Sequence, residues 1–166
     1  MNIEYRPVNV DEIAAFQRAQ SRAFLLHPME QDLENYSRLF EPKRSIAAFD
    51  GGDIVGTAGA RSLEMTLPGG KLLPTAAVVD VSVQPTHRRR GILTEMMRRH
   101  FTECRERGDP ISALWASESI IYGRFGYGMG IEHFDFAIDV DHSAFRKPIR
   151  NAGIVKLVDR ERIKTD

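Results

Sequence analysis

The sequence predicts one α/β domain built on a mixed β-sheet with helices on both faces. Its 166 residues fit a single domain, and an apolar content of 42 % is enough for a buried core. Strand-like segments come first along the chain, and a strand, helix, strand order follows that is typical of a parallel, right-handed unit. Ligands of such sheets bind at the carboxyl ends of the strands.

The N-terminal part predicts one strand and two helices. Residues 2–8 have strand character, and Asp11 can cap the helix that follows. The apolar residues of that helix recur near helical spacing at Ile13, Phe16, Ala19 and Phe24. A second, shorter helix is expected over residues 31–40.

Two glycine turns predict a run of antiparallel strands. Residues 44–49 and 54–65 have strand character, and Asp50-Gly-Gly-Asp53 between them is a strong hairpin signal. A second turn at Pro68-Gly-Gly70 returns the chain as a strand that runs through Val83.

The longest predicted helix covers about residues 89–107, and Gly108 followed by Pro110 supplies its end. Its inward face carries Ile92, Leu93, Met96, Met97, His100, Phe101 and Cys104. The segments expected after it are a strand over 111–116, a short helix over 118–125 and a strand over 131–140.

The loop between Val83 and this helix has the features of a phosphate site. The first turn of a helix has unpaired backbone N–H groups and a positive partial charge, so an anion is stabilised there. Arg88 to Arg90 add positive charge, and Gly91 lets the backbone turn and approach a ligand. A solvated helix start is the alternative interpretation. The spacing fits neither a P-loop nor a dinucleotide fingerprint.

Charge favours one small anionic ligand over a nucleic acid. The net charge is zero, but residues 87–107 hold seven arginines and three glutamates. No His, Cys or carboxylate cluster with metal-ligand spacing is present, so no metal is predicted. Cys104 is the single cysteine and is expected to be a buried helix thiol.

No stretch approaches the roughly 20 apolar residues of a membrane span. Residues 1–6 lead directly into strand-like sequence without a signal-peptide core. A cytoplasmic protein without a membrane partner is therefore expected.

Three motifs carry a resemblance to a known family. They are Pro-Thr-His-Arg-Arg-Arg-Gly-Ile-Leu at 85–93, Ala-Leu-Trp-Ala-Ser-Glu at 113–118 and Ile-Tyr-Gly-Arg-Phe-Gly-Tyr-Gly at 121–128. Together they resemble the Eis-like (enhanced intracellular survival) branch of the GNAT acetyltransferases. The usual GNAT loop has Gly or Ala where this chain has Leu93.

The resemblance implies the GNAT acyl-CoA N-acyltransferase fold and transfer of an acetyl group from acetyl-CoA to a primary amine. The acceptors it implies are polycationic small molecules or lysine side chains, and it suggests a ring-like homo-oligomer. Eis-like proteins are much longer and have further domains. We therefore expect a fragment or shortened relative, with a GNAT domain over residues 1–150 and a linker over 151–166. The linker includes the first strand of a missing second domain, at Ile154 to Val158.

The resemblance also assigns the cofactor site. It places the acetyl and pantetheine groups along the strand at Val81, Ser82 and Val83. The diphosphate would lie at the helix start, held by Arg88, Arg89, Gly91 and Ile92. A further contact with the cofactor would come from Ser117 and Glu118, after the next strand.

Two residues are candidates for proton transfer. Tyr122, the first tyrosine of the third motif, is the expected general acid, since a phenol with a pKa of about 10 is protonated at neutral pH; core packing is its alternative role, as it is for Tyr127. The family's general base is a carboxylate at the end of the longer chain. Asp80 interrupts an apolar strand on the side of Ser82, so it is either a base, acting directly or through water, or half of a structural pair with an arginine.

One functional alternative stays open. Binding of acetyl-CoA is equally expected of a non-catalytic regulatory or assembly module. Only Tyr122 and a competent base favour catalysis.

Overall fold

The computed structural model describes residues 3–27, 29–132, 134–147, 153–154 and 156–159. The chain divides into two compact units, Met1–Gly128 and Met129–Asp166, and the first holds the sheet and its main helices. The predicted boundary near residue 150 stays a prediction.

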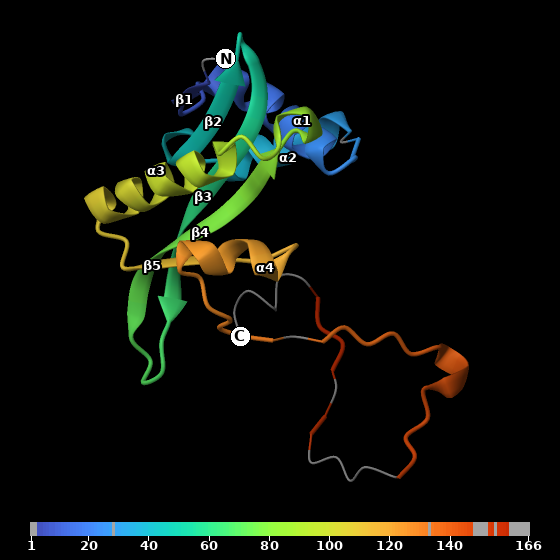
Figure 1. The fold of residues 1–166 in the computed structure, drawn as a ribbon. Helices are drawn as coiled ribbons and strands as arrows, with labels where there is room; N and C mark the ends of the chain where they lie inside the picture. The colour runs from blue at the N-terminus through green and yellow to red at the C-terminus, as the bar shows by residue number, and fades with distance from the viewer. Residues whose placement is uncertain (1–2, 28, 133, 148–152, 155, 160–166) are drawn as a thin grey trace. The chain divides into compact units, whose positions relative to one another are not determined.

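The first unit is a five-stranded sheet in the order β1-β2-β3-β4-β5 (Figure 1). Neighbours from β1 to β4 are antiparallel, whereas β5 runs parallel to β4, so the predicted mixed sheet is confirmed. The strands are β1 Glu4–Arg6, β2 Ser45–Asp50, β3 Asp53–Thr66, β4 Leu72–Val83 and β5 Ile111–Leu114.

The described residues also form four α-helices and five short 3-10 turns. The helices are α1 Ile13–Ala23, α2 Glu30–Leu39, α3 Ile92–Arg107 and α4 Ser119–Tyr122. The 3-10 turns are η1 Val10–Glu12, η2 Pro42–Arg44, η3 Pro85–His87, η4 Gly123–Phe125 and η5 Val140–His142. The helix α3 joins β4 to β5 and ends at Gly108, whose φ of 77° suits glycine at a helix end.

Helices cover both faces of the sheet, as predicted. Alternate residues of a strand point to opposite faces. In β2, Ile46 and Ala48 cluster with Ile92 of α3, whereas Ala47 clusters with Phe16 of α1. The helix α3 therefore packs on one face and α1 on the other.

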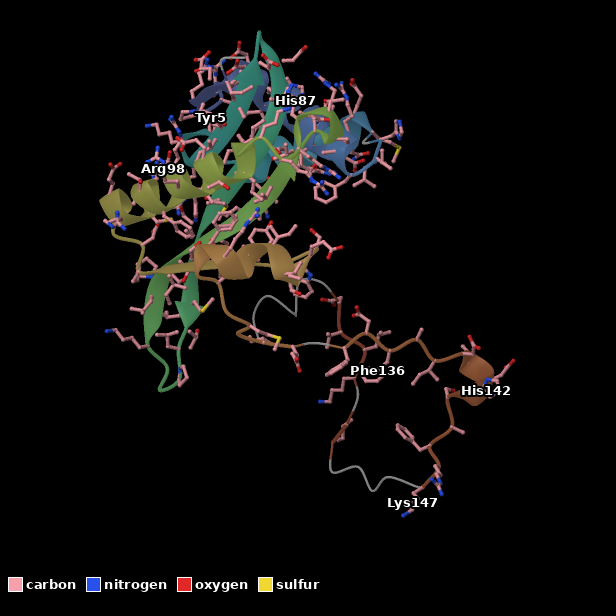
Figure 2. All side chains as sticks on the ribbon, viewed as in Figure 1. Tyr5, His87, Arg98, Phe136, His142 and Lys147 are labelled. Atoms are coloured by element: carbon pink, nitrogen blue, oxygen red, sulfur yellow. The ribbon has the colours of Figure 1, made fainter. Side chains whose placement is uncertain are left out.

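The predicted strand over 131–140 is wrong. Of this segment, residues 131, 132 and 134–139 have no regular structure, and η5 begins at Val140. Phe136, labelled in Figure 2, is 85 % exposed. Alternating apolar residues suit a strand, but a strand also needs a hydrogen-bonded neighbour, and the described part of this segment has none. Residues 154 and 156–158 are not a strand either, and 155 lies outside the described residues.

Within the described residues, no helix combines the length and the apolar character needed to cross a membrane.

Candidate active site

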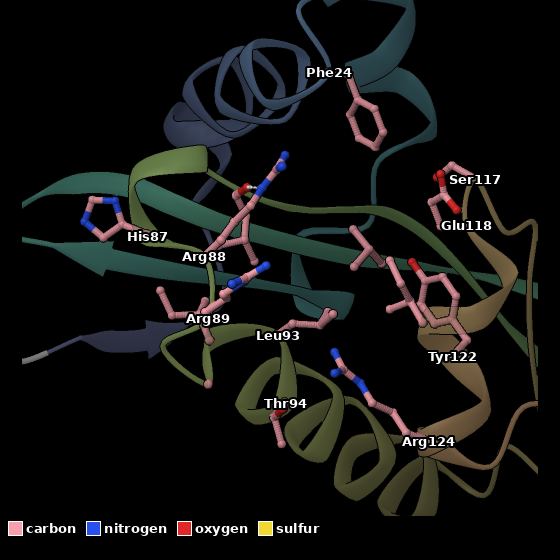
Figure 3. Close-up of a pocket in the computed structure, with 15 residues that line it drawn as sticks. Phe24, His87, Arg88, Arg89, Leu93, Thr94, Ser117, Glu118, Tyr122 and Arg124 are labelled. Carbon is pink, nitrogen blue, oxygen red and sulfur yellow. Dashed lines mark hydrogen bonds between the residues drawn. The ribbon is translucent and has the colours of Figure 1, made fainter.

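A pocket of about 640 Å³ opens beside the carboxyl end of β4 (Figure 3). β4, the loop before α3, the start of α3 and the segment after β5 all line it. It brings together nine of the eleven residues expected from the sequence: Val81, Val83, Arg88, Arg89, Gly91, Ile92, Ser117, Glu118 and Tyr122. Asp80 and Ser82 do not line it.

The start of α3 presents free backbone donors to this pocket. Gly91 is the N-cap residue, with φ 78° and no side chain to cap the helix. The Gly91 carbonyl accepts from the N–H of Glu95, which leaves the N–H groups of Ile92 to Thr94 without acceptors inside the helix. Such donors, together with the helix dipole, form an anion-binding end.

Two arginines stand beside these donors. Arg88 and Arg89 are exposed, and neither forms an ion pair with a described carboxylate. Arg88 Nε donates to the Val83 carbonyl at 3.4 Å. Glu118 is the single carboxylate among the lining residues, so the pocket carries excess positive charge.

The end of β4 has an open edge. β5 pairs with β4 only from Thr75 to Val78, although β4 continues to Val83. The last residues of β4 therefore have no strand on the β5 side within the described part of the chain. Their backbone groups can bond to an extended ligand lying beside Val81 and Val83.

A β-bulge precedes this edge. Thr57 pairs with Ser82 and Gly59 with Val79, so Asp80 and Val81 both lie opposite one residue of β3. The Asp80 backbone is left-handed, with φ 58°. Aspartate tolerates this conformation better than most residues. Bulges occur often beside active sites, where they redirect a side chain.

The bulge directs Asp80 to α2. The Tyr36 hydroxyl donates to Asp80 Oδ2 at 2.7 Å. Burial raises the pKa of the Asp80 carboxyl, and the Tyr36 hydrogen bond opposes that rise. The hydrogen-bond partner of Asp80 is therefore a phenol, and the nearby positive charge of Arg61 also lowers the Asp80 pKa.

Ser82 is buried, and its hydroxyl lies 2.7 Å from the Thr57 hydroxyl. Its side chain is thus used inside the sheet. Any contact of Ser82 with a ligand must come from its backbone.

Tyr122, the last residue of α4, is half-buried in the pocket wall. Burial raises the pKa of its phenol, which keeps the group protonated at neutral pH. Its ring meets the Tyr127 ring edge-on at 5.9 Å. The Tyr127 hydroxyl in turn lies 2.5 Å from the Ser112 hydroxyl, so Tyr127 packs behind Tyr122.

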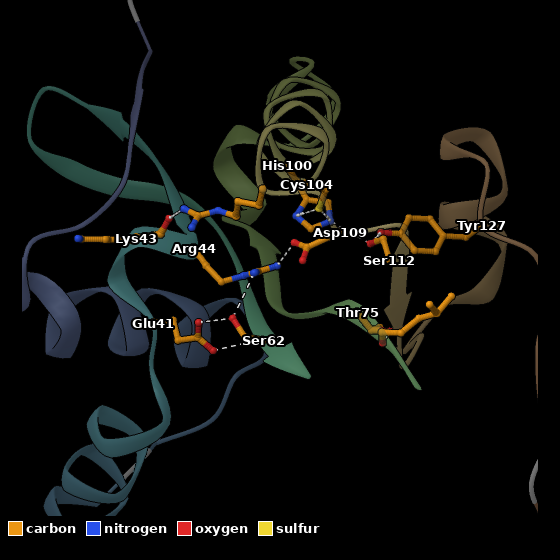
Figure 4. Close-up of polar contacts among 12 residues, drawn as sticks. Glu41, Lys43, Arg44, Ser62, Thr75, His100, Cys104, Asp109, Ser112 and Tyr127 are labelled. Carbon is orange, nitrogen blue, oxygen red and sulfur yellow. Dashed lines mark hydrogen bonds and ion pairs between the residues drawn. The ribbon is translucent and has the colours of Figure 1, made fainter. Parts of the chain in front are cut away.

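A buried histidine of α3 contacts the residues that pack behind Tyr122 (Figure 4). His100 Nε2 lies 2.9 Å from the Ser112 hydroxyl, which also contacts Tyr127. Burial lowers the pKa of His100 to about 4, so the ring is neutral near pH 7. Cys104, one turn later, is buried as predicted, and burial raises the pKa of its thiol.

We expect His100→Gln to reduce the acid sensitivity of the fold. Because the folded-state pKa lies below the ordinary value of 6.5, the neutral ring stabilises the fold above about pH 6.5, and this contribution is lost as pH falls through about 4. The loss by pH 4 is about 3 kcal/mol. Urea unfolding at pH 7 and pH 4 should show the smaller pH difference in the variant. His27→Gln, at an exposed site, should leave the difference unchanged, and an unchanged difference in His100→Gln would contradict the assignment.

Six lining residues are not among the predicted site residues, although four of them lie in the quoted motifs: Phe24, His87, Leu93, Thr94, Ile121 and Arg124. Leu93 and Thr94 follow directly from the helix start. Phe24 comes from the end of α1, and no local signal connects it with this pocket. His87 Nε2 lies 3.1 Å from Asp50 Oδ2 and ties the loop to β2.

Comparisons with known proteins agree on one family. Residues 4–130 match the model of the acetyltransferase (GNAT) domain. An uncharacterised N-acetyltransferase of Streptomyces avermitilis is 49 % identical over 116 residues, which are 70 % of this chain and 28 % of that protein. The N-acetyltransferase Eis of Mycobacterium tuberculosis is 39 % identical over 104 residues, 63 % of this chain and 26 % of Eis. The chain spans 40 % or less of the length of these curated relatives.

Solved structures show the same fold. Eis1 from Mycobacterium abscessus matches with a TM-score of 0.68 at 36 % identity, over 76 % of this chain and 31 % of Eis1. A predicted acetyltransferase from Clostridium acetobutylicum, solved with acetyl-CoA, matches with a TM-score of 0.68 at 20 % identity, over 86 % of this chain and 100 % of that one. The family model covers all five strands and the pocket, and the chain therefore belongs to the GNAT acetyltransferase family.

Proposed function

We propose that this domain binds acetyl-CoA in the pocket beside β4 and transfers the acetyl group to a primary amine. The observation that carries the proposal is the convergence of an anion-binding helix start, an open strand edge and a phenol in one pocket. The volume of about 640 Å³ lies within the range of roughly 300–1,000 Å³ found for ligand pockets.

The lining fits the chemistry of coenzyme A from one end to the other. Arg88, Arg89 and the first N–H groups of α3 would hold the diphosphate. The open edge at Val81 to Val83 would bond to the amides of the pantetheine arm, and Ser117 and Glu118 would contact it from the β5 side. The Clostridium acetobutylicum relative, which has the same fold, was solved with acetyl-CoA.

In this arrangement the amine nitrogen forms a bond to the thioester carbon while the carbon–sulfur bond breaks. Strand N–H groups at Val81 to Val83 would stabilise the negative charge that develops on the carbonyl oxygen. Tyr122 would donate its proton to the departing thiolate. Positioning the two reactants can itself contribute roughly 7 to 11 kcal/mol, so modest proton transfer suffices.

Asp80 is our candidate for the group that receives the amine proton, and because it does not line the pocket the transfer would run through water. Its carboxyl must be ionised to accept a proton, and its raised pKa moves the acidic limb of the pH profile upward. The rate should therefore fall as pH decreases through that raised pKa.

Asp80→Asn separates this role from a structural one. Asparagine keeps an oxygen that can accept from Tyr36 and tolerates a positive φ. If Asp80 is the base, turnover should fall by about a hundredfold or more while the melting temperature is kept. Turnover that stays intact would remove Asp80 from the mechanism and leave it as the partner of Tyr36.

For the acceptor, we propose the class implied by the likeness to Eis: a polycationic small molecule or a lysine side chain. Phe24 would form the acceptor side of the pocket. The direct test is to mix the full chain with acetyl-CoA and a panel of primary amines and to follow thiol release. Amine-dependent release would support the proposal. Thermal stabilisation by CoA without release for any amine would indicate a binding module instead.

A further inference from the structure

Arg124 is a third arginine in the pocket wall, and it comes from η4 rather than from the loop before α3. Its guanidinium carbon lies 4.8 Å from the centroid of the Phe125 ring. Within the described residues it forms no ion pair with a carboxylate. An exposed arginine that lines a pocket without an acidic partner is available to an anionic ligand.

The stacking on Phe125 prepares the guanidinium for such a ligand. The guanidinium lies over this ring, and the cation–π contact limits its movement. Its five N–H donors form no hydrogen bond to another described residue. A phosphate can accept two of them at once.

The orientation of the Arg124 side chain determines which end of the ligand it can contact. In Figure 3 Arg124 extends from η4 toward the start of α3, where Leu93 and Thr94 line the pocket. The Tyr122 hydroxyl, which marks the proposed thioester end, points away from it. Arg124 therefore faces the proposed diphosphate end.

Coenzyme A carries a second anionic group at that end. Its ribose bears a 3′-phosphate, one sugar away from the diphosphate. A phosphomonoester has a charge of about −1.5 to −2 at pH 7. The loop arginines and α3 amides are proposed to hold the diphosphate, and Arg124 is a further arginine of the pocket that can bind the 3′-phosphate.

We propose that Arg124 binds the 3′-phosphate of coenzyme A and makes this pocket select CoA over 3′-dephospho-CoA. The inference rests on the proposed function, because it assumes that the pocket holds CoA. It adds a specificity-determining residue that acts on the cofactor and takes no part in acetyl transfer.

The test is calorimetric titration of the full chain and of Arg124→Gln with CoA and with 3′-dephospho-CoA. We expect the wild-type chain to bind CoA about tenfold more tightly than dephospho-CoA. Arg124→Gln should bind CoA about tenfold more weakly, with binding of dephospho-CoA unchanged. Arg124→Lys should keep part of the preference, because it retains the charge but not the planar pair of donors.

Arg38→Gln is the matched control, since Arg38 is an exposed arginine of α2 outside the pocket, and it should bind both ligands like the wild type. Melting curves establish that each variant is folded. An equal loss for both ligands in Arg124→Gln would overturn the assignment to the 3′-phosphate. Failure of the wild-type chain to bind CoA would instead overturn the proposed function, and this inference with it.

Discussion

Tyr122→Phe should lower amine-dependent thiol release by about a hundredfold or more while CoA binding stays unchanged. The hydroxyl is the group proposed to protonate the departing thiolate, and removal of a general acid typically costs this much. Phenylalanine keeps the ring that packs edge-on against Tyr127. The measurement is the turnover rate at saturating acetyl-CoA, with CoA affinity determined by calorimetry on the same sample.

Tyr127→Phe is the matched control for this change. It removes a hydroxyl from the neighbouring ring, whose partner is Ser112 rather than the pocket. We expect a small loss of stability and near-normal turnover per folded molecule. If Tyr122→Phe also retains near-normal turnover, Tyr122 is a packing residue and the proposed acid is wrong.

Replacing Arg88 and Arg89 together by alanine should weaken CoA binding by about a hundredfold, since each charge-assisted hydrogen bond lost at this exposed site is worth about tenfold. Pantetheine, which has no phosphate, should bind both proteins equally. The two affinities can be measured by calorimetry or by competition.

An exposed pair elsewhere, Arg18→Ala with Arg38→Ala, controls for the change in net charge. This control should bind CoA like the wild type. Equal losses for CoA and pantetheine in the Arg88 and Arg89 variant would contradict the diphosphate assignment.

The helix start could be predicted from sequence because its signals are local. Gly91, the arginines before it and the apolar spacing after it lie within a few residues of one another. The helix α3 begins at Ile92 rather than at the predicted residue 89, because Arg89 and Gly91 both have a positive φ. The residues of β4 and those at 117–118 needed the family resemblance. These residues lie close to the loop before α3 because of how the strands pair, and no short sequence motif predicts strand pairing.

The sequence could not show what depends on contacts between distant segments. The bulge at Asp80 arises from the pairing of β4 with β3, and its partner Tyr36 lies on α2. Phe24 enters the pocket from α1, far from the motifs. In the segment 131–140 the sequence predicted a strand that the structure does not have. The alternating apolar pattern favours a strand, but the described part of this segment has no neighbouring strand to pair with.

The most direct test of the central claim is calorimetric titration of CoA into the full chain. Binding by the start of α3 and its arginines predicts a saturable heat, one CoA for each chain, and an affinity that weakens as salt is added. No detectable heat at millimolar CoA would contradict the assignment of this pocket.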